Sequence, residues 1–193
     1  MGMNIGLASI YFAAYTNTEV IYSYEPFKQT YEQALYNIGL NKEISGGKIK
    51  PFNYGLSGCD KTIDMPFYFE ASGSMSTTEG NDNLKNAKSW GVRRGGAASI
   101  ETVHLKDASS VISDILKNHK QNKILLKIDC EGSEYDILDS LDKTGLLNNI
   151  NYIILEWHFK GESYLLDILN KYNFISFSKY SSKEIGLIYA VKA

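Results

Sequence analysis

Residues 124–138 read ILLKIDCEGSEYDIL. The first five of these residues are apolar apart from one lysine, and Asp129 follows them, a pattern typical of a buried strand. Apolar side chains then change to helical spacing, beginning with Tyr135 and Leu138. Gly132 stands between the two patterns and readily allows a sharp turn. The stretch therefore predicts a strand that passes through a tight turn directly into a helix.

The same alternation of strand-like and helical runs continues along the chain. It predicts an α/β fold with a largely parallel sheet, because a helix between two strands returns the chain to the same direction. The last two strands are separated by a short polar segment, which predicts an antiparallel C-terminal hairpin. The expected strands are Val20–Tyr24, Lys48–Leu56, Ile124–Asp129, Asn151–Glu156, Phe174–Ser178 and Ile185–Val191.

Apolar residues at helical spacing predict helices around Phe27–Ile38, Val111–Leu116, Tyr135–Leu141 and Tyr164–Tyr172, and Pro26 is expected in the first turn of the first one.

Two further strand-like runs, Thr62–Phe69 and Ser99–Leu105, have no helix between them. The connection Ser72–Ala98 is long for a compact domain and contains Arg93 and Arg94. It is either a solvated loop or a lid whose cations contact the substrate.

Composition bounds the class of protein. The 193 residues are 44% hydrophobic, which suits one domain over residues 1–193. A formal net charge of −2 favours neither nucleic acid nor an anionic membrane as a partner. Cys59 and Cys130 form no metal or redox motif, and the uncharged run at residues 5–15 lacks the basic start of a signal peptide. We therefore expect a cytoplasmic protein.

Three of the expected strands end on an acid, namely Glu25, Asp129 and Glu156. In open α/β sheets, ligands bind outside the carboxyl ends of the strands, and parallel strands bring these ends to one edge. Acids also favour the starts of helices, which is the alternative explanation. The pattern predicts a site at the carboxyl edge of the sheet.

A glycine-containing segment, Gly2-Met3-Asn4-Ile5-Gly6, leads into an apolar helical run. Glycines allow the close ligand approach that a nucleotide-type ligand needs. Glu25 follows Gly6 by 19 residues, close to the spacing between a glycine loop and the acid that holds ribose hydroxyls. A dinucleotide fingerprint would need glycines where Asn4 and Leu7 stand.

Four segments together resemble the FkbM-type S-adenosylmethionine-dependent methyltransferases: GMNIG at 2–6, YSYEPF at 22–27, KIDCEGSEYDIL at 127–138 and IILEWH at 153–158. KIDCEGSE is the specific part, whereas many methyltransferases share the glycine loop. The resemblance runs from Met1 to about His158 and implies the class I methyltransferase sheet of seven strands, the last of them antiparallel. It also implies S-adenosylmethionine as cofactor, with its methionine side at Gly2, Asn4 and Gly6 and its ribose hydroxyls at Glu25.

Methyl transfer to an alcohol needs a base, because an alcohol is a poor nucleophile until its proton leaves. Asp129 and His158 stand at adjacent strand ends and are the expected catalytic residues, with Asp129 also near the cofactor. A capping or supporting role is the alternative for His158. The residues expected to contact the substrate are Glu131, Glu156, Arg93 and Arg94.

A divalent metal is a further alternative, because Asp129, Glu131, Glu156 and His158 offer oxygen and imidazole donors. The resemblance does not require an ion, and we expect none.

The sequence thus predicts an O-methyltransferase that acts on a hydroxyl of a sugar, a glycan or a secondary-metabolite scaffold. An NAD-type oxidoreductase is the first alternative, because the spacing from Gly6 to Glu25 would serve it too. A non-catalytic binding module that keeps the fold is the second.

One element that the resemblance implies is missing. In that fold the glycine loop follows a buried strand, whereas Met1 stands directly before Gly2. The strand would lie between Val20–Tyr24 and Ile124–Asp129, whose backbone groups would lose partners at a cost of about 1–3 kcal/mol each. We therefore expect an N-terminally truncated methyltransferase of poor stability and weak cofactor binding. Direct pairing of the two flanking strands is the alternative.

Overall fold

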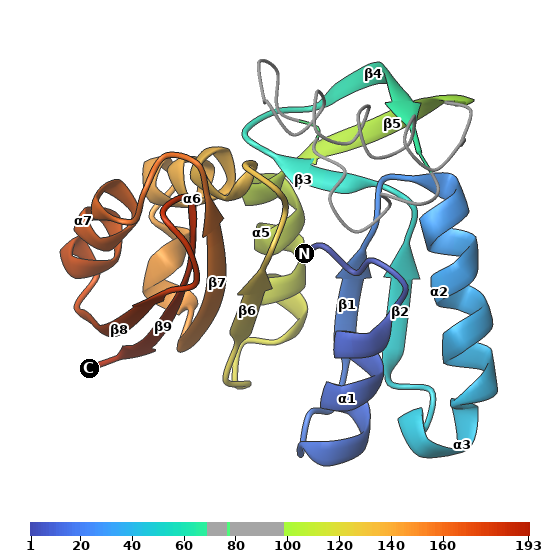
Figure 1. The fold of residues 1–193 in the computed structure, drawn as a ribbon. Helices are drawn as coiled ribbons and strands as arrows, with labels where there is room; N and C mark the ends of the chain where they lie inside the picture. Colours follow the sequence, from blue (N-terminus) through green and yellow to red (C-terminus); the bar gives the residue numbers. More distant parts are fainter. Residues whose placement is uncertain (69–76, 78–98) are drawn as a thin grey trace. The chain divides into compact units, whose positions relative to one another are not determined.

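The computed structural model describes residues 1–68, 77 and 99–193, which form a mixed α/β fold (Figure 1). None of the helices in these ranges is both long enough and apolar enough to cross a membrane. The described residues divide into two compact units, and each is considered by itself. The first unit holds residues 1–55, 61–68 and 99–105, and the second holds residues 56–60, 77 and 106–193.

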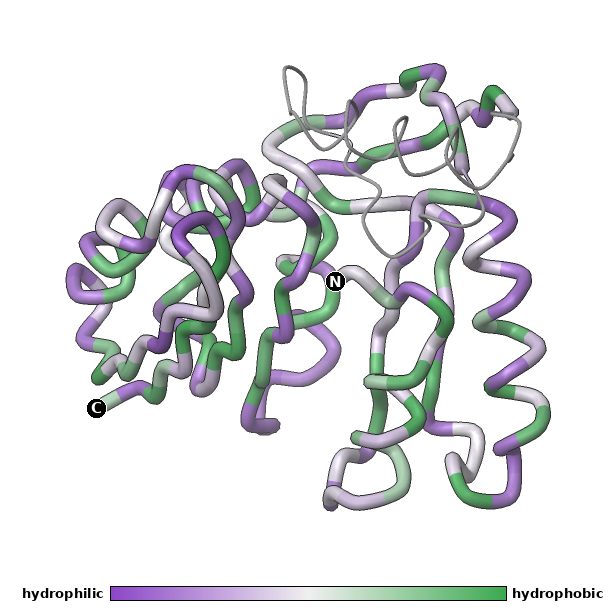
Figure 2. The backbone as a smooth tube through the Cα atoms, viewed as in Figure 1, coloured by the Kyte–Doolittle hydropathy of each residue, from purple (hydrophilic) through white to green (hydrophobic). Residues whose placement is uncertain are grey.

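A two-stranded parallel sheet forms the centre of the first unit. β1 (Ile21–Tyr24) pairs with β2 (Ile49–Phe52), and the chain between them forms α2 (Lys28–Leu40) and α3 (Lys42–Ser45). α1 (Leu7–Tyr15) precedes β1, contains no charged residue, and is coloured mainly as hydrophobic in Figure 2. The uncharged run near the N-terminus is therefore a helix of this unit.

Two expectations about local structure are wrong, one at the start of α2 and one at the end of β2. Phe27 has an extended backbone and caps α2, so Pro26 lies before the helix and not in its first turn. The run expected as one strand over Lys48–Leu56 is divided into β2 and β3 (Gly55–Ser57). The chain leaves the ladder between them at Asn53, whose Nδ2 donates to the backbone oxygen of Glu25 at 2.9 Å.

A three-stranded sheet has the order β3-β5-β4. β4 (Lys61–Phe67) is antiparallel to β5 (Ser99–Asp107), and β5 continues into α5 (Ala108–Asn118). Both strand-like runs of this region therefore form strands. The expected lid, Ser72–Ala98, lies outside the described residues except for Thr77.

The second unit contains a four-stranded sheet of order β6-β7-β9-β8. β6 is parallel to β7, whereas β9 runs antiparallel to both of its neighbours. The expected antiparallel hairpin is therefore confirmed as β8 and β9. The elements of this unit after α5 are β6 (Leu125–Ile128), α6 (Glu134–Lys143), η2 (Leu146–Asn149), β7 (Tyr152–His158), α7 (Ser163–Lys171), β8 (Phe174–Tyr180) and β9 (Ile185–Lys192).

The core of the second unit lies between this sheet and its helices. Leu138 and Leu141 of α6, Leu165 of α7, and Leu155 and Trp157 of β7 are fully buried. Burial of a large apolar side chain contributes roughly 1.5–3 kcal/mol. These side chains hold β7 and α6 in fixed positions, and both elements carry residues of the candidate site.

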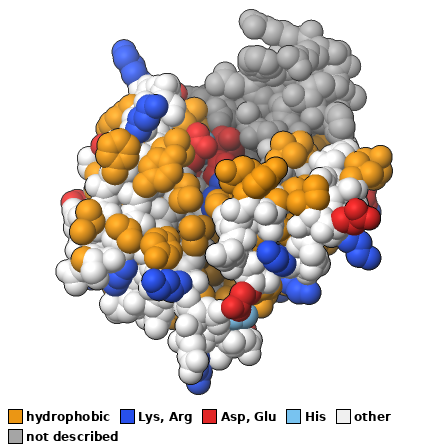
Figure 3. Space-filling view, turned by 90° about the horizontal axis from the view of Figure 1, so that it is seen from below, with side chains coloured by type: hydrophobic (Ala, Val, Ile, Leu, Met, Phe, Trp, Pro, Cys, Tyr) orange, Lys and Arg blue, Asp and Glu red, His pale blue; other side chains and the backbone are white. Residues whose placement is uncertain are grey.

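Other large apolar side chains remain exposed, and Figure 3 shows many hydrophobic side chains on the face that it presents. Exposed apolar groups that lie together are typical of contact surfaces. On α1 these side chains are Leu7, Tyr11 and Tyr15, and on β8 and β9 they are Ile175, Phe177, Tyr180, Tyr189 and Val191.

The expectation of one largely parallel sheet needs correction, because the sheets are mixed. β1–β2 and β6–β7 are parallel, and helical segments connect the strands of each pair. β4–β5, β7–β9 and β8–β9 are antiparallel.

Candidate functional site

Acidic side chains and a histidine lie together where β6 and β7 end. The parallel ladder sets Ile128 opposite Leu155, so that Asp129 and Glu156 follow at the same edge. Asp129, Glu156 and His158 each place one oxygen or nitrogen that could ligate a metal within 4.8 Å of the other two. The register of two neighbouring strands thus brings together residues that are far apart in the chain.

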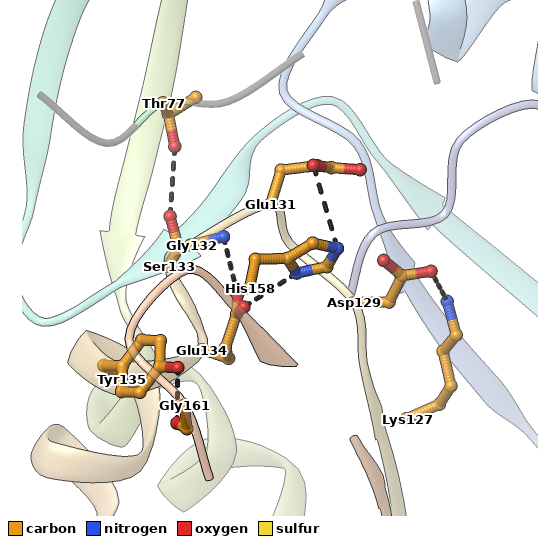
Figure 4. Close-up of polar contacts among 10 residues, drawn as sticks. All are labelled: Thr77, Lys127, Asp129, Glu131, Gly132, Ser133, Glu134, Tyr135, His158 and Gly161. Carbon is orange, nitrogen blue, oxygen red and sulfur yellow. Dashed lines mark hydrogen bonds and ion pairs between the residues drawn. The ribbon is translucent and has the colours of Figure 1, made fainter. Parts of the chain in front are cut away.

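His158 is the last residue of β7 and is only 3% exposed. Its Nδ1 lies 2.8 Å from Oε1 of Glu134, and its Nε2 lies 3.7 Å from Oε2 of Glu131 (Figure 4). The ring therefore stands between two carboxylates that come from the turn before α6 and from the start of that helix.

This turn has an unusual backbone. Glu131 has a φ of 51° and Gly132 a φ of 108°, both in the left-handed region. The backbone N–H of Gly132 donates to Oε2 of Glu134 at 2.8 Å. The side chain of Glu134 thereby folds back over the turn and is fully buried.

Ordinary helix capping describes the start of α6 only in part. Ser133 does occupy the cap position, but its side chain makes no capping hydrogen bond. Its Oγ lies 3.2 Å from Oγ1 of Thr77 instead. Glu134 stands in the first turn, where acids ordinarily complement the helix dipole, but its carboxylate bonds Gly132 and His158 in the interior.

Burial and mutual charge shift the ionisation of the group. Burial raises the pKa of Glu131 to about 7, although the charge of His158 opposes this shift. Burial, together with the charge of Asp129, raises the pKa of Glu156. Burial by itself would lower the pKa of His158, but the hydrogen bond and charge of Glu134 outweigh it and raise this pKa. The site therefore favours a proton on the imidazole and disfavours several negative charges at once.

Lys127 supplies a positive charge next to the group, with its Nζ 2.7 Å from Oδ2 of Asp129. The oxygen and imidazole donors of Asp129, Glu156 and His158 are types that divalent ions use. Such groups are also common without an ion, and Asp129 already has a cationic partner. The geometry alone therefore assigns no metal to these residues.

The glycine loop of the first unit is fixed by backbone hydrogen bonds. Gly2, Asn4 and Gly6 have φ values of 69°, 50° and 88°, so every second residue is left-handed. The N–H of Met3 donates to the oxygen of Tyr24 at 2.8 Å, next to the end of β1. The loop therefore has a defined shape where it enters α1.

Glu25 connects this loop to the start of α2. Its Oε2 accepts the N–H of Asn4 at 2.9 Å, and its Oε1 accepts the N–H of Phe27 at 3.1 Å. The side chain is buried, and burial raises its pKa to about 7 in spite of these two hydrogen bonds. Two oriented backbone donors therefore fix the carboxylate in place.

The predicted residues thus fall into two groups, one in each unit. Gly2, Asn4, Gly6 and Glu25 lie together in the first unit, and Asp129, Glu131, Glu156 and His158 lie together in the second. Arg93 and Arg94 lie outside the described residues.

Sequence reasoning missed Glu134 as a partner of His158. A signal was available, because Glu134 precedes Leu138 and Leu141 at intervals of four and seven residues. These intervals place the carboxylate on the same face as the buried leucines of α6. An acid on a buried helix face needs a partner inside the protein.

Three comparisons relate the chain to known proteins. A family model described as the Methyltransferase FkbM domain matches residues 1–176. Methyltransferase sdnD of Sordaria araneosa is 27% identical over 172 residues, which cover 83% of this chain and 66% of that protein. Methyltransferase 1 of Beauveria bassiana is 27% identical over 146 residues, which cover 73% of this chain and 56% of that protein. The chain thus spans less than two thirds of the length of either relative.

A solved structure has a similar fold. The crystal structure of Methyltransferase FkbM from Methylobacillus flagellatus KT matches with a TM-score of 0.55 at 14% sequence identity. The match covers 98% of this chain and 41% of that one. The likeness therefore extends over nearly the whole chain, and at this identity it concerns the fold.

Proposed function

Because the chain belongs to the FkbM methyltransferase domain family, we propose that it transfers a methyl group from S-adenosylmethionine to a hydroxyl group. The acceptor we propose is a sugar, a glycan or the scaffold of a secondary metabolite. The observation that carries the proposal is buried His158, whose ring lies beside Glu131 and Glu134 at the edge that Asp129 and Glu156 share. A group of bases and hydrogen-bond acceptors suits a reaction in which a hydroxyl loses its proton.

The carboxylate of Glu25 fits the ribose of this cofactor. Each of its oxygens accepts one backbone N–H and retains a second acceptor position. Two acceptors held at a fixed orientation match the two donors of a vicinal diol. We assign Glu25 to the ribose hydroxyls, and Gly2, Asn4 and Gly6 to the methionine side.

The residues of the second unit have the task of preparing the acceptor. When bound, the cofactor supplies a methyl group that is already activated on a sulfonium. Orienting the acceptor oxygen and removing its proton are left to the protein. We assign proton removal to His158 and Asp129, with Asp129 also contacting the cofactor.

Further contacts would hold the acceptor in place. Glu131 and Glu156 offer carboxylate oxygens to its other hydroxyls, and we assign them to the substrate. We give the same role to Arg93 and Arg94 from their place in the sequence alone.

We also propose that the strands belong to a class I methyltransferase sheet. The position of β9, antiparallel between β7 and β8, supports this assignment. The connection of β6 to parallel β7 through α6 supports it as well.

Equilibrium binding tests the cofactor and separates the alternatives. Isothermal titration calorimetry of the 193-residue chain should detect binding of S-adenosylmethionine and S-adenosylhomocysteine but not of NAD. Glu25→Ala should weaken this binding at least about tenfold, the loss expected for one good hydrogen-bonding group. Preference for NAD would instead indicate an oxidoreductase, and binding of none of the three would favour a non-catalytic module.

Transfer itself is tested with methyl-labelled S-adenosylmethionine and a panel of monosaccharides and glycosides. We expect label in at least one hydroxyl acceptor, and loss of this label in His158→Gln. Binding of the cofactor without label in any acceptor of the panel would contradict the proposed acceptor class.

A further inference from the structure

Glu134 is a fully buried carboxylate with a nitrogen facing each of its oxygens. Gly132 donates its backbone N–H to Oε2 at 2.8 Å, and Nδ1 of His158 lies 2.8 Å from Oε1. Figure 4 shows the carboxylate between these two partners. An isolated charge is costly to bury, whereas a buried charge with every oxygen bonded is tolerated. The arrangement is therefore specific to a carboxylate at this position.

The backbone holds both partners of Glu134. Gly132 is left-handed, and this conformation directs its N–H toward the side chain two residues later. Beyond His158, Phe159 donates its N–H to the oxygen of Glu184 at 2.7 Å, and Lys160 donates to the oxygen of His158 at 2.9 Å. The ladder with β9 holds the backbone up to His158, and these two bonds hold it beyond, so the imidazole belongs to a fixed segment.

The contact with Glu134 determines which ring nitrogen carries the proton. An ionised carboxylate only accepts hydrogen bonds, so its partner at Nδ1 is an N–H. A neutral imidazole has one proton, and the other nitrogen then carries a lone pair. That nitrogen is Nε2, which lies 3.7 Å from Oε2 of Glu131, longer than a hydrogen bond.

We propose that Glu134 is a positioning residue that holds His158 as the Nδ1–H tautomer, so that Nε2 is the nitrogen that accepts a proton. The tautomer follows from the contacts of Glu134 alone. The statement that the proton comes from a hydroxyl acceptor rests on the proposed function. A carboxylate that orients an imidazole for proton transfer acts in the same way in Ser-His-Asp triads.

Glutamine in place of Glu134 makes a sharp test, because it preserves the volume and removes one acceptor. With its oxygen on Nδ1 of His158, its NH₂ group would face the N–H of Gly132. Turned the other way, the NH₂ group would face Nδ1–H. With His158 as the Nδ1–H tautomer, either orientation sets one donor against another in a buried place. The turned orientation pairs every group once the proton is on Nε2 instead, so the variant favours the Nε2–H tautomer.

Nitrogen-15 NMR of the histidine rings in the full chain reads the tautomer directly. The chain has three histidines, and His158→Gln identifies the signals of His158. When the ring is neutral, we expect the chemical shift of a protonated nitrogen at Nδ1 and that of an unprotonated nitrogen at Nε2. The opposite assignment in the wild-type protein would overturn the proposal.

Two variants then test the role of Glu134. Glu134→Gln should convert the single tautomer of His158 into a mixture or invert it. Asp136→Asn makes the same chemical change two residues along α6 and should leave the spectrum unchanged. An unaltered His158 spectrum in folded Glu134→Gln would refute the proposal. The wild-type spectrum decides the tautomer even if Glu134→Gln does not fold.

The NMR result on the tautomer of His158 can be told apart from the result of the methyl-transfer assay. A chain that shows the Nδ1–H tautomer but neither binds S-adenosylhomocysteine nor transfers methyl groups keeps the positioning role and loses the proposed reaction. A chain that transfers methyl groups while His158 carries its proton on Nε2 keeps the reaction and loses the role of Glu134.

Discussion

Gly186 lies directly opposite Trp157 in the antiparallel ladder between β7 and β9, and a Cβ on this glycine would stand 2.6 Å from Cζ2 of the indole ring. Real Cβ atoms do not approach other atoms so closely. Trp157 is fully buried, and the next residue along β7 is His158. The absence of a side chain at Gly186 therefore provides the space that the indole fills in the core of the second unit.

Alanine at Gly186 should therefore destabilise the protein by overpacking, at a cost of about 1–3 kcal/mol. Chemical denaturation monitored by circular dichroism measures the loss. Gly39→Ala is the matched control, because this helical glycine has nothing within 4 Å of an added Cβ and should be neutral or slightly stabilising. Equal stability of Gly186→Ala and wild type would contradict the packing described for Trp157.

Cofactor binding should depend on pH through Glu25, whose pKa is raised to about 7 by burial. Only the ionised form offers all of its oxygen lone pairs to the hydroxyls of a ribose. As the pH falls below about 7, the acid becomes protonated, and affinity for S-adenosylhomocysteine should drop about tenfold per pH unit. Calorimetric titrations between about pH 8 and pH 5 measure this slope.

Glu25→Gln is the control for this effect, because it removes the titrating group. It should bind more weakly at high pH and lose most of the slope. An affinity of the wild-type chain that stays constant over the whole range would contradict the assignment of Glu25 to the ribose.

Asp107 should stabilise the start of α5 in a pH-dependent way. Its carboxylate accepts the N–H of Ser110 at 2.8 Å and the hydroxyl O–H of Ser140 at 2.9 Å, and it also accepts the O–H of Ser109. Burial alone would raise its pKa, but these hydrogen bonds outweigh it and lower the pKa. The stabilisation is therefore complete above the ordinary pKa of an aspartate and is lost as the pH falls through the lowered value.

Asp107→Ala should cost about 0.5–2 kcal/mol at neutral pH, the usual loss for a helix cap. The cost should shrink in acid, and urea titrations at several pH values measure it. Asp114→Ala on the same helix is the comparison, because Asp114 forms an exposed ion pair with Lys117 and its loss should cost between 0 and about 1 kcal/mol. Equal losses for the two variants would contradict the role of the cap.

Kinetics of methyl transfer should show that Glu134 acts through His158. With an acceptor from the monosaccharide panel, His158→Gln should lower kcat by about 10²–10⁴, the usual contribution of a general base, and leave KM nearly unchanged. Glu134→Gln should lower kcat as well, but no further in the His158→Gln background. Additive losses in the double variant would show that Glu134 acts independently of His158.

Where strong local patterns decide the structure, the sequence was sufficient to predict it. The apolar run before Asp129 and the glycine after it required a strand, a turn and a helix, and β6 and α6 have this arrangement. Asp129 and Glu156 were expected together because parallel strands end at one edge, and their donor atoms do lie close together.

Features that depend on tertiary contacts could not be predicted from the sequence. The break at Asn53 arises from its hydrogen bonds to Glu25 and Pro26, residues that are distant in the chain. In the sequence, the preference of acids for helix starts would account for Glu134, and only its burial against His158 reveals a different role. The parallel direction expected for most of the sheet fails at β4 and β5, which form an antiparallel ladder.

The left-handed backbone of Glu131, together with the substrate contact proposed for its carboxylate, sets folding against activity at a single residue. A residue with a Cβ pays roughly 1–2 kcal/mol for this conformation, whereas glycine adopts it freely. Glu131→Gly should therefore melt no lower than the wild type while removing the carboxylate beside His158. A search for thermostable variants would then select against this glutamate, whereas under the proposed function a search for active variants would retain it.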